Sequence, residues 1–263
     1  MGIAVLKSHR FAVSILLLGL CVGLTPSQAQ QAQPAQPAQV SALEGLSFIK
    51  KLKLARAGDD VAQLSVALDY ELGQNAARKD AGQAARWYRE SALLGNVEAQ
   101  YRLAKMVSGG APEVAQDLPA ALKLFQSAAE RGHLASQNEM GLRLQKGEGT
   151  AVNLDQAIVW YQKAADKNYA PSQVNLGLLF VKGEGVKQDH AQAFALFEKA
   201  ATAGDAWGLN NLGSMYEMGW GTTADKIKAK SYYEQAMAKG NKMGEANLQR
   251  LVANTGATTS ATE

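Results

Sequence analysis

Histidine is the first residue type to consider as a source of chemistry, because it ligates metals and transfers protons near neutral pH. Beyond the first 29 residues the sequence holds His133 and His190 and no cysteine. The two histidines are 57 residues apart, and neither shares a zinc-ligand spacing with a second ligand residue. We predict no metal site and no cofactor, and we expect both histidines to be exposed at helix ends.

Ser47 and Lys50 form an S-x-x-K pattern, which carries the nucleophile of penicillin-recognising enzymes. The companion patterns S-D-N and K-T-G are absent from the sequence. We therefore predict that Ser47 and Lys50 lie on a capping helix, that the protein is not an enzyme and that it has no catalytic residue.

The tetrapeptide Lys-Gly-Glu-Gly occurs twice, at residues 146–149 and 182–185. Such a loop can hold a phosphate on its backbone N–H groups, or it can end a helix where the backbone turns left-handed. The copies are 36 residues apart, and the next position of that series, 218–221, keeps the glycines but loses the lysine and the glutamate. A phosphate site would need its lysine, so we interpret the motif as a structural turn with Glu148 and Glu184 solvated.

The same interval of 36 or 37 residues organises the elements around these side chains. One series of glycines and one asparagine is typical of positive φ at helix C-termini: Gly58, Gly95, Gly132, Asn168, Gly204 and Gly240. A second series is predicted to end the first helix of each unit: Gly73, Gly110, Gly147, Gly183 and Gly219. A third contains only good N-cap residues for the second helix: Asp80, Asp117, Asn153, Asp189 and Asp225.

Large apolar residues of the second helices recur in register with small residues of the first helices, as nested helix pairs require. One pair of this size cannot bury its own apolar face, whereas a stack of pairs can. The predicted fold is all-α: a right-handed α/α solenoid of about five helix-turn-helix repeats with a capping helix at each end. The repeats are 58–94, 95–131, 132–167, 168–203 and 204–239, between capping helices at 42–57 and 240–252.

The first 29 residues are typical of a secretory signal peptide, with Lys7 and Arg10 before a 14-residue apolar run. Cleavage is predicted after Ala29, which leaves no transmembrane anchor and places the protein in the periplasm or outside the cell. An uncleaved anchor is the alternative, but the run is shorter than the ~20 residues of a spanning helix. Lipidation of Cys21 is disfavoured because the bulky Leu20 precedes it.

Loss of Lys7 and Arg10 lowers the formal charge from +3 to +1, which is not the charge pattern of a nucleic-acid-binding protein. The mature chain would hold no cysteine, so packing rather than disulfides must stabilise it. Residues 30–41 are predicted to be a flexible Gln/Ala/Pro linker, and residues 253–263 a disordered tail.

Units such as NYAPSQVNLGLLFVKGEGVKQDHAQAFALFEKAATA resemble Sel-one-like repeats, which are related to the tetratricopeptide repeat. The resemblance covers residues 58–251 and recurs five times. The second unit departs from it in its turn, GGAPEVAQD, and the first turn lacks the second glycine, so these two turns are expected to differ in shape.

The resemblance implies an adaptor or scaffold that binds a protein or peptide through the concave face lined by the first helices. We expect the partner to be in the bacterial envelope; the sequence does not indicate the oligomeric state. Residues that vary between units at non-core positions are the predicted binding residues: Tyr101, Arg102, Lys105, Asn138, Asn175, Trp207, Asn210 and Asn211. Asparagine amides can pair with a peptide backbone, and arginine can bind a carboxylate.

The alternative function is binding or hydrolysis of β-lactams or peptidoglycan. It also comes from the resemblance, since some relatives are associated with β-lactams. Those relatives are cysteine-rich, whereas Cys21 is the single cysteine of this sequence.

Overall fold

The computed structural model describes residues 43–259 of the 263-residue chain. The predicted signal peptide (1–29), the whole predicted linker (30–41) and residue 42, the predicted start of the capping helix, therefore lie outside the described residues. Within the described range the chain forms α-helices joined by turns, and the only β-type pairing is a single bridge between Ala111 and Val114. The predicted all-α class is confirmed.

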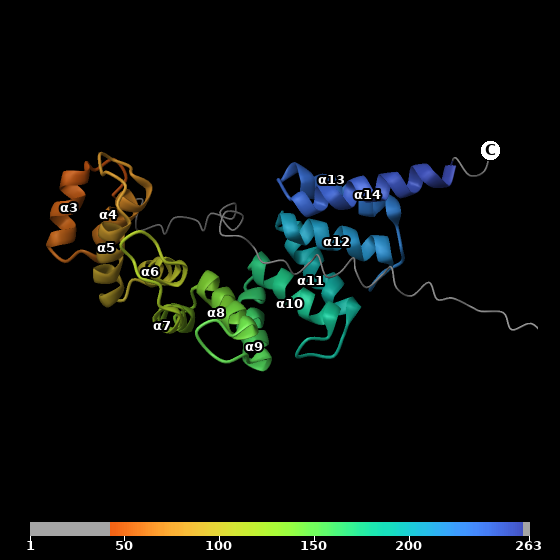
Figure 1. Cartoon of the computed structure of the whole chain (residues 1–263), viewed down its shortest axis with the longest axis horizontal. Coiled ribbons are helices and arrows are strands. Elements are labelled where there is room, and N and C mark those ends of the chain that lie inside the picture. The colour runs from red at the N-terminus through yellow and green to blue at the C-terminus, as the bar shows by residue number, and fades with distance from the viewer. Residues whose placement is uncertain (1–42, 260–263) are drawn as a thin grey trace, which may run out of the picture. The chain divides into compact units, whose positions relative to one another are not determined.

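Twelve helices follow one another along the described residues (Figure 1). Their bounds are α3 (Phe48–Arg56), α4 (Asp60–Leu72), α5 (Ala81–Leu93), α6 (Val97–Gly109), α7 (Leu118–Glu130), α8 (Leu134–Lys146), α9 (Leu154–Ala165), α10 (Ala170–Lys182), α11 (His190–Thr202), α12 (Ala206–Met218), α13 (Lys226–Ala238) and α14 (Lys242–Thr259).

Each of five repeats pairs a first helix with a second helix. The first helices are α4, α6, α8, α10 and α12, and each packs against the second helix that follows it and the helix that precedes it. α3 packs on α4 and α14 packs on α13, so a further helix covers each end of this stack. α10 also contacts α12, and α12 contacts α14, so first helices of neighbouring repeats lie against one another.

The backbone at the repeat boundaries has the predicted left-handed conformation. All six unit-opening positions have positive φ, from 60° at Asn168 to 93° at Gly58. The five predicted N-cap residues each accept a backbone N–H of the second helix at 2.8–3.0 Å. Each such cap contributes about 1 kcal/mol, so the punctuation of the repeat is also part of its stability.

The second glycine of the repeated turn allows close approach to the preceding repeat. A Cβ on Gly149 would lie 2.7 Å from the carbonyl oxygen of Leu118, and one on Gly185 would lie 2.7 Å from Leu154 Cβ. Leu118 and Leu154 are the first residues of α7 and α9. The glycines of the Lys-Gly-Glu-Gly motif thus join consecutive repeats, as the structural interpretation predicts.

The first two turns differ from the others, as expected. Asn75 and Ala76 in the first turn and Glu113 in the second have positive φ without being glycine. The cap of α6 at Gly110 combines φ 66° with ψ 146°, whereas Gly147 has φ 74° and ψ 30°.

The core consists of aromatic side chains of the second helices packed on small residues of the first helices. The aromatic series is at most 1% exposed: Tyr88, Phe125, Tyr161, Phe197 and Tyr233. A Cβ on Gly141 would lie 2.6 Å from the Tyr161 ring, and a Cβ on Gly177 would lie 2.6 Å from the Phe197 ring. The predicted pairing of large and small residues is therefore correct.

The N-terminal capping helix begins at Phe48 rather than at residue 42, because residues 43–45 form a turn in which Gly45 has positive φ. Lys51 occupies the register of the buried aromatics, and its Nζ lies 3.1 Å from Asp69 Oδ2 in an ion pair with both side chains at most 7% exposed. Ile49, which the apolar pattern would place on the packing side, is 79% exposed.

At the other end, α14 continues to Thr259, seven residues beyond the predicted end at residue 252. Residues 253–259, predicted as disordered tail, are therefore helical, whereas 260–263 lie outside the described residues. The segment contains no proline and a single glycine, Gly256, so each added residue still gains a backbone hydrogen bond.

Candidate partner-binding face of the first helices

All eight predicted binding residues lie on first helices, but three of them are buried. Asn138 is 9% exposed, Asn211 is 2% exposed and Asn210 has no exposed surface. The other five are half-buried: Tyr101, Arg102, Lys105, Asn175 and Trp207. The expectation of exposed positions is wrong for the three asparagines. Ser172 and Asn175 of α10 bond to Asn138, and α12, which carries Asn210 and Asn211, packs against α10 and α14.

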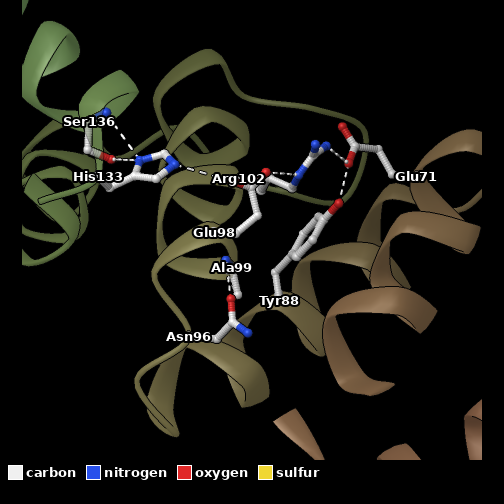
Figure 2. Close-up of polar contacts among 8 residues, drawn as sticks. All are labelled: Glu71, Tyr88, Asn96, Glu98, Ala99, Arg102, His133 and Ser136. Atoms are coloured by element: carbon white, nitrogen blue, oxygen red, sulfur yellow. Dashed lines mark hydrogen bonds and ion pairs between the residues drawn. The ribbon is translucent and has the colours of Figure 1, made fainter. Parts of the chain in front are cut away.

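Arg102 on α6 joins carboxylates from two repeats (Figure 2). Its Nε donates to Glu98 Oε1 at 2.6 Å, and its Nη1 donates to Glu71 Oε2 at 3.3 Å. Glu71 also accepts a hydrogen bond from the buried Tyr88 hydroxyl. A carboxylate of a partner would have to displace one of these internal pairs to reach Arg102.

His133 extends this network to the third repeat, as Figure 2 shows. Its Nδ1 accepts from the Ser136 backbone N–H at 3.2 Å, so the Nε2 carries the proton and donates to Glu98 Oε2 at 3.2 Å. The His133 side chain is 16% exposed, and its ring lies 4.9 Å from that of Tyr101. The prediction of an exposed histidine is wrong, because the start of α8 packs on α6 through this ring.

His190 is also half-buried rather than exposed. It is the first residue of α11, and its ring stacks on Trp220 of the next repeat at 4.5 Å. The Trp220 loop approaches the start of α11 closely, which covers the ring and explains the difference from the prediction.

A second chain of ion pairs follows α6 and α8. Lys105 Nζ lies 3.5 Å from Glu139 Oε1, and Arg143 reaches Glu139 at 3.3 Å and Glu148 at 2.6 Å. Arg143 also donates to Ser108 Oγ at 3.3 Å. We call the residues of these ion pairs, together with those of the Arg102 and His133 contacts, the charged segment: Glu71, Glu98, Arg102, Lys105, His133, Glu139, Arg143 and Glu148.

The environment of the charged segment favours the ionised form of Glu98 and the protonated form of the buried tyrosines beside it. Burial alone would raise the pKa of Glu98, but hydrogen bonds from His133 and Arg102 and the Arg102 charge hold it below its ordinary value. Burial, reinforced by the negative charge of Glu139, raises the pKa of Tyr169 to about 12. Burial raises the pKa of Tyr101 in the same way. With their pKa values raised, the hydroxyls of these tyrosines stay protonated and neutral near neutral pH.

The buried tyrosines of the second helices have polar partners on their own first helices. The Tyr161 hydroxyl donates to Gln145 at 2.9 Å, and the Tyr233 hydroxyl donates to Glu217 at 2.7 Å. In the two repeats whose buried aromatic residue is a phenylalanine, the position equivalent to Gln145 and Glu217 is occupied by Ser108, opposite Phe125, and by Val181, opposite Phe197. A strong acceptor is thus present in each repeat that has a buried hydroxyl.

Asparagines replace the charges in the later repeats. Asn175 Nδ2 on α10 donates to Asn138 Oδ1 on α8 at 2.9 Å, and the Ser172 hydroxyl donates to the same oxygen at 3.0 Å. Asn247 Nδ2 on α14 donates to Asn210 Oδ1 on α12 at 2.9 Å. We call Asn138, Asn175, Asn210, Asn211 and Asn247, together with Trp207, the asparagine segment.

A model of the Sel1 repeat matches residues 60–96, 97–133, 134–169, 170–205 and 208–241, which is more than half of the chain. The chain belongs to the Sel1 repeat family. Sel1-repeat proteins are in general protein-interaction modules, and the matched units coincide with the helix pairs described above. No curated protein matches the chain in sequence.

Solved Sel1-repeat structures resemble this chain over most of its length. A Sel1 repeat protein from Oxalobacter formigenes is 25% identical with a TM-score of 0.70, over 76% of this chain and 86% of that one. A protective antigen of uropathogenic Escherichia coli with the same repeat fold is 26% identical with a TM-score of 0.62, over 80% of this chain and 52% of that one. An immunity protein from Pseudomonas aeruginosa is 16% identical with a TM-score of 0.50, over 88% of this chain and 83% of that one, which shows the fold alone.

Metal binding, S-x-x-K chemistry and membrane spanning would each need specific features among the described residues. Within residues 43–259, no three histidine, cysteine or acidic side chains are grouped so that they could hold a metal ion. Ser47 precedes α3 as its N-cap, and both Ser47 and Lys50 are exposed. None of the described helices combines the length and apolarity that crossing a bilayer requires.

Sequence reasoning missed several residues of this face. Glu98 and Glu139 share registers with predicted binding residues but were not selected, and Asn247 was treated as part of a cap. The signal for Asn247 was available, because it continues the series of Asn175 and Asn211 at the same interval of 36 residues.

Proposed function

We propose that this Sel1-repeat chain is an exported, non-enzymatic adaptor or scaffold that holds a protein or peptide partner of the bacterial envelope on its first helices. The proposal rests on one position of the repeat at which the residue type varies while the framework residues of the repeat stay constant. At a single register of the first helices the residue changes along the chain: Ser65, Arg102, Glu139, Asn175 and Asn211. The aromatic and cap registers of the same repeats stay constant, so this face is where repeats can differ in what they bind.

The chemistry of the face supports a protein partner rather than a small ionic ligand. Arg102 and Arg143 are each bonded to two carboxylates within the protein. Most asparagine amides of this face are also bonded to one another, which leaves the unpaired amide of Asn211 and the half-buried Trp207 to meet a polypeptide, an amide for its backbone and an indole for its side chains. Export is proposed from the basic and apolar pattern of residues 1–29.

A pull-down from an envelope extract with the mature chain as bait tests the proposal. A second bait carries Tyr101→Ala, Asn175→Ala and Asn211→Ala on the first helices. A matched control carries Lys123→Ala, Asp155→Ala and Lys199→Ala, all exposed positions of second helices. We expect the first variant to lose the partner and the control to keep it; retention by both would overturn the proposal.

The non-enzymatic part has its own test. Purified mature chain is incubated with a chromogenic β-lactam and, separately, with peptidoglycan. We expect no turnover. Hydrolysis that Ser47→Ala abolishes would show that the chain is an enzyme.

A further inference from the structure

The asparagine segment repeats one donor three times. Asn175, Asn211 and Asn247 occupy the same register of α10, α12 and α14. Asn175 donates to Asn138 and Asn247 donates to Asn210, each at 2.9 Å. In both cases the acceptor lies on the preceding first helix, one residue before the position equivalent to the donor. The geometry therefore defines a regular bond from one repeat to the next.

This bond is missing at Asn211. Its acceptor would stand at Val174, which has no acceptor atom in its side chain. Asn211 is 2% exposed, and its Nδ2 has no hydrogen-bond partner among the described residues. Its Oδ1 accepts only a 3.4 Å contact from Asn210. A buried amide donor without a partner is costly and rare, so its retention calls for an explanation.

The repeat register places two apolar residues, Trp207 and Leu178, beside Asn211. Trp207 lies one turn earlier on α12, and helical side chains lean toward the preceding turn, which brings the Asn211 amide toward the indole. Leu178 on α10 and Asn211 on α12 occupy the positions equivalent to Lys105 and Glu139 in earlier repeats. Lys105 Nζ lies 3.5 Å from Glu139 Oε1, so we expect Leu178 to lie near Asn211. Trp207 and Leu178 are both half-buried.

We propose that Asn211 anchors a peptide subsite between α10 and α12. Its Nδ2 donates to a backbone carbonyl of an extended, uncharged segment of the partner, and an apolar side chain of that segment packs on Trp207 and Leu178. An extended segment fits because its carbonyls are unpaired, whereas those of a helix are satisfied internally. Asn211 is 2% exposed in the free protein, so the side chains that cover its amide must move on binding. The inference rests on the proposed function and names where, and with what chemistry, it operates.

Three substitutions separate this subsite from ordinary packing in the free protein. Asn175→Ala removes a formed hydrogen bond and is expected to lower Tm by roughly 2–4 °C, whereas Asn211→Ala is expected to leave Tm unchanged or raise it. Val174→Asn restores the missing acceptor, at a register where Asn138 and Asn210 already fit, and is expected to raise Tm. A loss of Tm in Asn211→Ala equal to that in Asn175→Ala would overturn the proposal.

Binding is measured with peptides selected from a phage-displayed library of random 12-residue sequences on the full chain, then synthesised and titrated. We expect a neutral consensus with apolar positions. Asn211→Ala and Val174→Asn should each weaken binding about fivefold to tenfold, the loss of one hydrogen bond. Asn247→Ala, whose donor is already used within the protein, is the matched control and should bind like the wild type.

The other outcomes identify which idea fails. If Val174→Asn leaves the affinity of the peptides unchanged while Tyr101→Ala reduces it, the subsite proposal is overturned and the proposed function is supported. A consensus rich in acidic or basic residues would overturn the uncharged subsite. Failure to select any peptide that binds a first helix would count against both proposals.

Discussion

Arg102 and Asn211 occupy the same register of their first helices, in the second and fifth repeats, and their surroundings differ in kind. Arg102 bonds to Glu98 and Glu71, so its charge is matched inside the protein. Among the described residues, Asn211 Nδ2 meets no acceptor. The charged segment joins repeats through ion pairs, although Arg143 Nε is also buried without a partner there, whereas the asparagine segment leaves a whole amide donor group unpaired at Asn211.

The difference shows that polar residues on a solenoid face need not be binding residues. From the sequence alone, Arg102 is the natural choice for binding a carboxylate. In the structure, Arg102 and Lys105 form ion pairs at the repeat junctions, and the subsite proposed above lies around Trp207 instead.

Replacing Arg102 with methionine should have the largest effect. The substitution leaves the buried Glu98 carboxylate and Glu71 without their cation, and removing one partner of such a network costs about 2–4 kcal/mol of unfolding free energy. Urea unfolding followed by circular dichroism measures it. The control is Lys105→Met, which removes one ion pair of a 38%-exposed side chain and should cost at most about 0.5 kcal/mol. Equal losses would show that Arg102 is not a junction residue.

Phe197→Tyr tests whether a buried hydroxyl needs an acceptor on its own first helix. The new hydroxyl would face Val181, where Tyr161 faces Gln145, so the change should cost about 1–3 kcal/mol. Adding Val181→Gln should recover most of that loss. Thermal unfolding of the two single variants and the double variant gives the coupling. If the double variant loses the sum of the single losses, the acceptor is not required.

Acid titration should destabilise the second and fifth repeats, which contain Glu98 and Glu217. Burial by itself would raise the pKa of Glu98 and of Glu217, but their hydrogen bonds to His133 and Arg250, with the nearby arginine charges, hold both below 4.5. A lowered folded-state pKa means that the stabilisation is complete above pH 4.5 and is lost as the pH falls through the folded-state value. Unfolding free energies measured from pH 6 to pH 3 should fall at the acid end.

Glu98→Gln and Glu217→Gln are the matched variants for this titration. Each should be less stable than the wild type at pH 6 and should lose less stability on acidification. If both variants lose as much unfolding free energy on acidification as the wild type, other carboxylates are responsible for that loss.

Asn247→Ala should have the smallest effect. It removes one hydrogen bond to Asn210 near the end of the stack, which is worth about 1 kcal/mol. Faster hydrogen exchange of α14 backbone amides would report it. Gln249→Ala, at an exposed position of the same helix, should leave the exchange unchanged. Equal exchange in the two variants would mean that the asparagine bond does not hold α14.

Most of the fold was predictable because its determinants are local and repeated. A positive φ at Asn168 or an N-cap at Asp117 depends on a few adjacent residues, and five copies reinforce each pattern. The helix ends outside the repeats were not predictable in the same way. Residues 253–259 lack a periodic apolar face, yet helix propagation carries α14 through them.

The candidate site was predictable in place but not in role. The registers that face the neighbouring first helix follow from the repeat, so Asn175 and Asn211 could be selected. Their burial depends on the distance between consecutive first helices, and Arg102 is satisfied by Glu71 from the preceding repeat. A single sequence indicates which residues share a face, but not which of them bond to each other.

Photo-crosslinking tests the central claim most directly. A photoreactive phenylalanine derivative replaces Leu178 on the first-helix face in one version of the mature chain, and Val159, a 52%-exposed residue of the second helix α9, in another. Both are illuminated in an envelope extract, and the adducts are compared by gel and mass spectrometry. The account predicts a specific protein adduct from position 178 and none from position 159. An adduct that forms only from position 159, or equally from both, would contradict it.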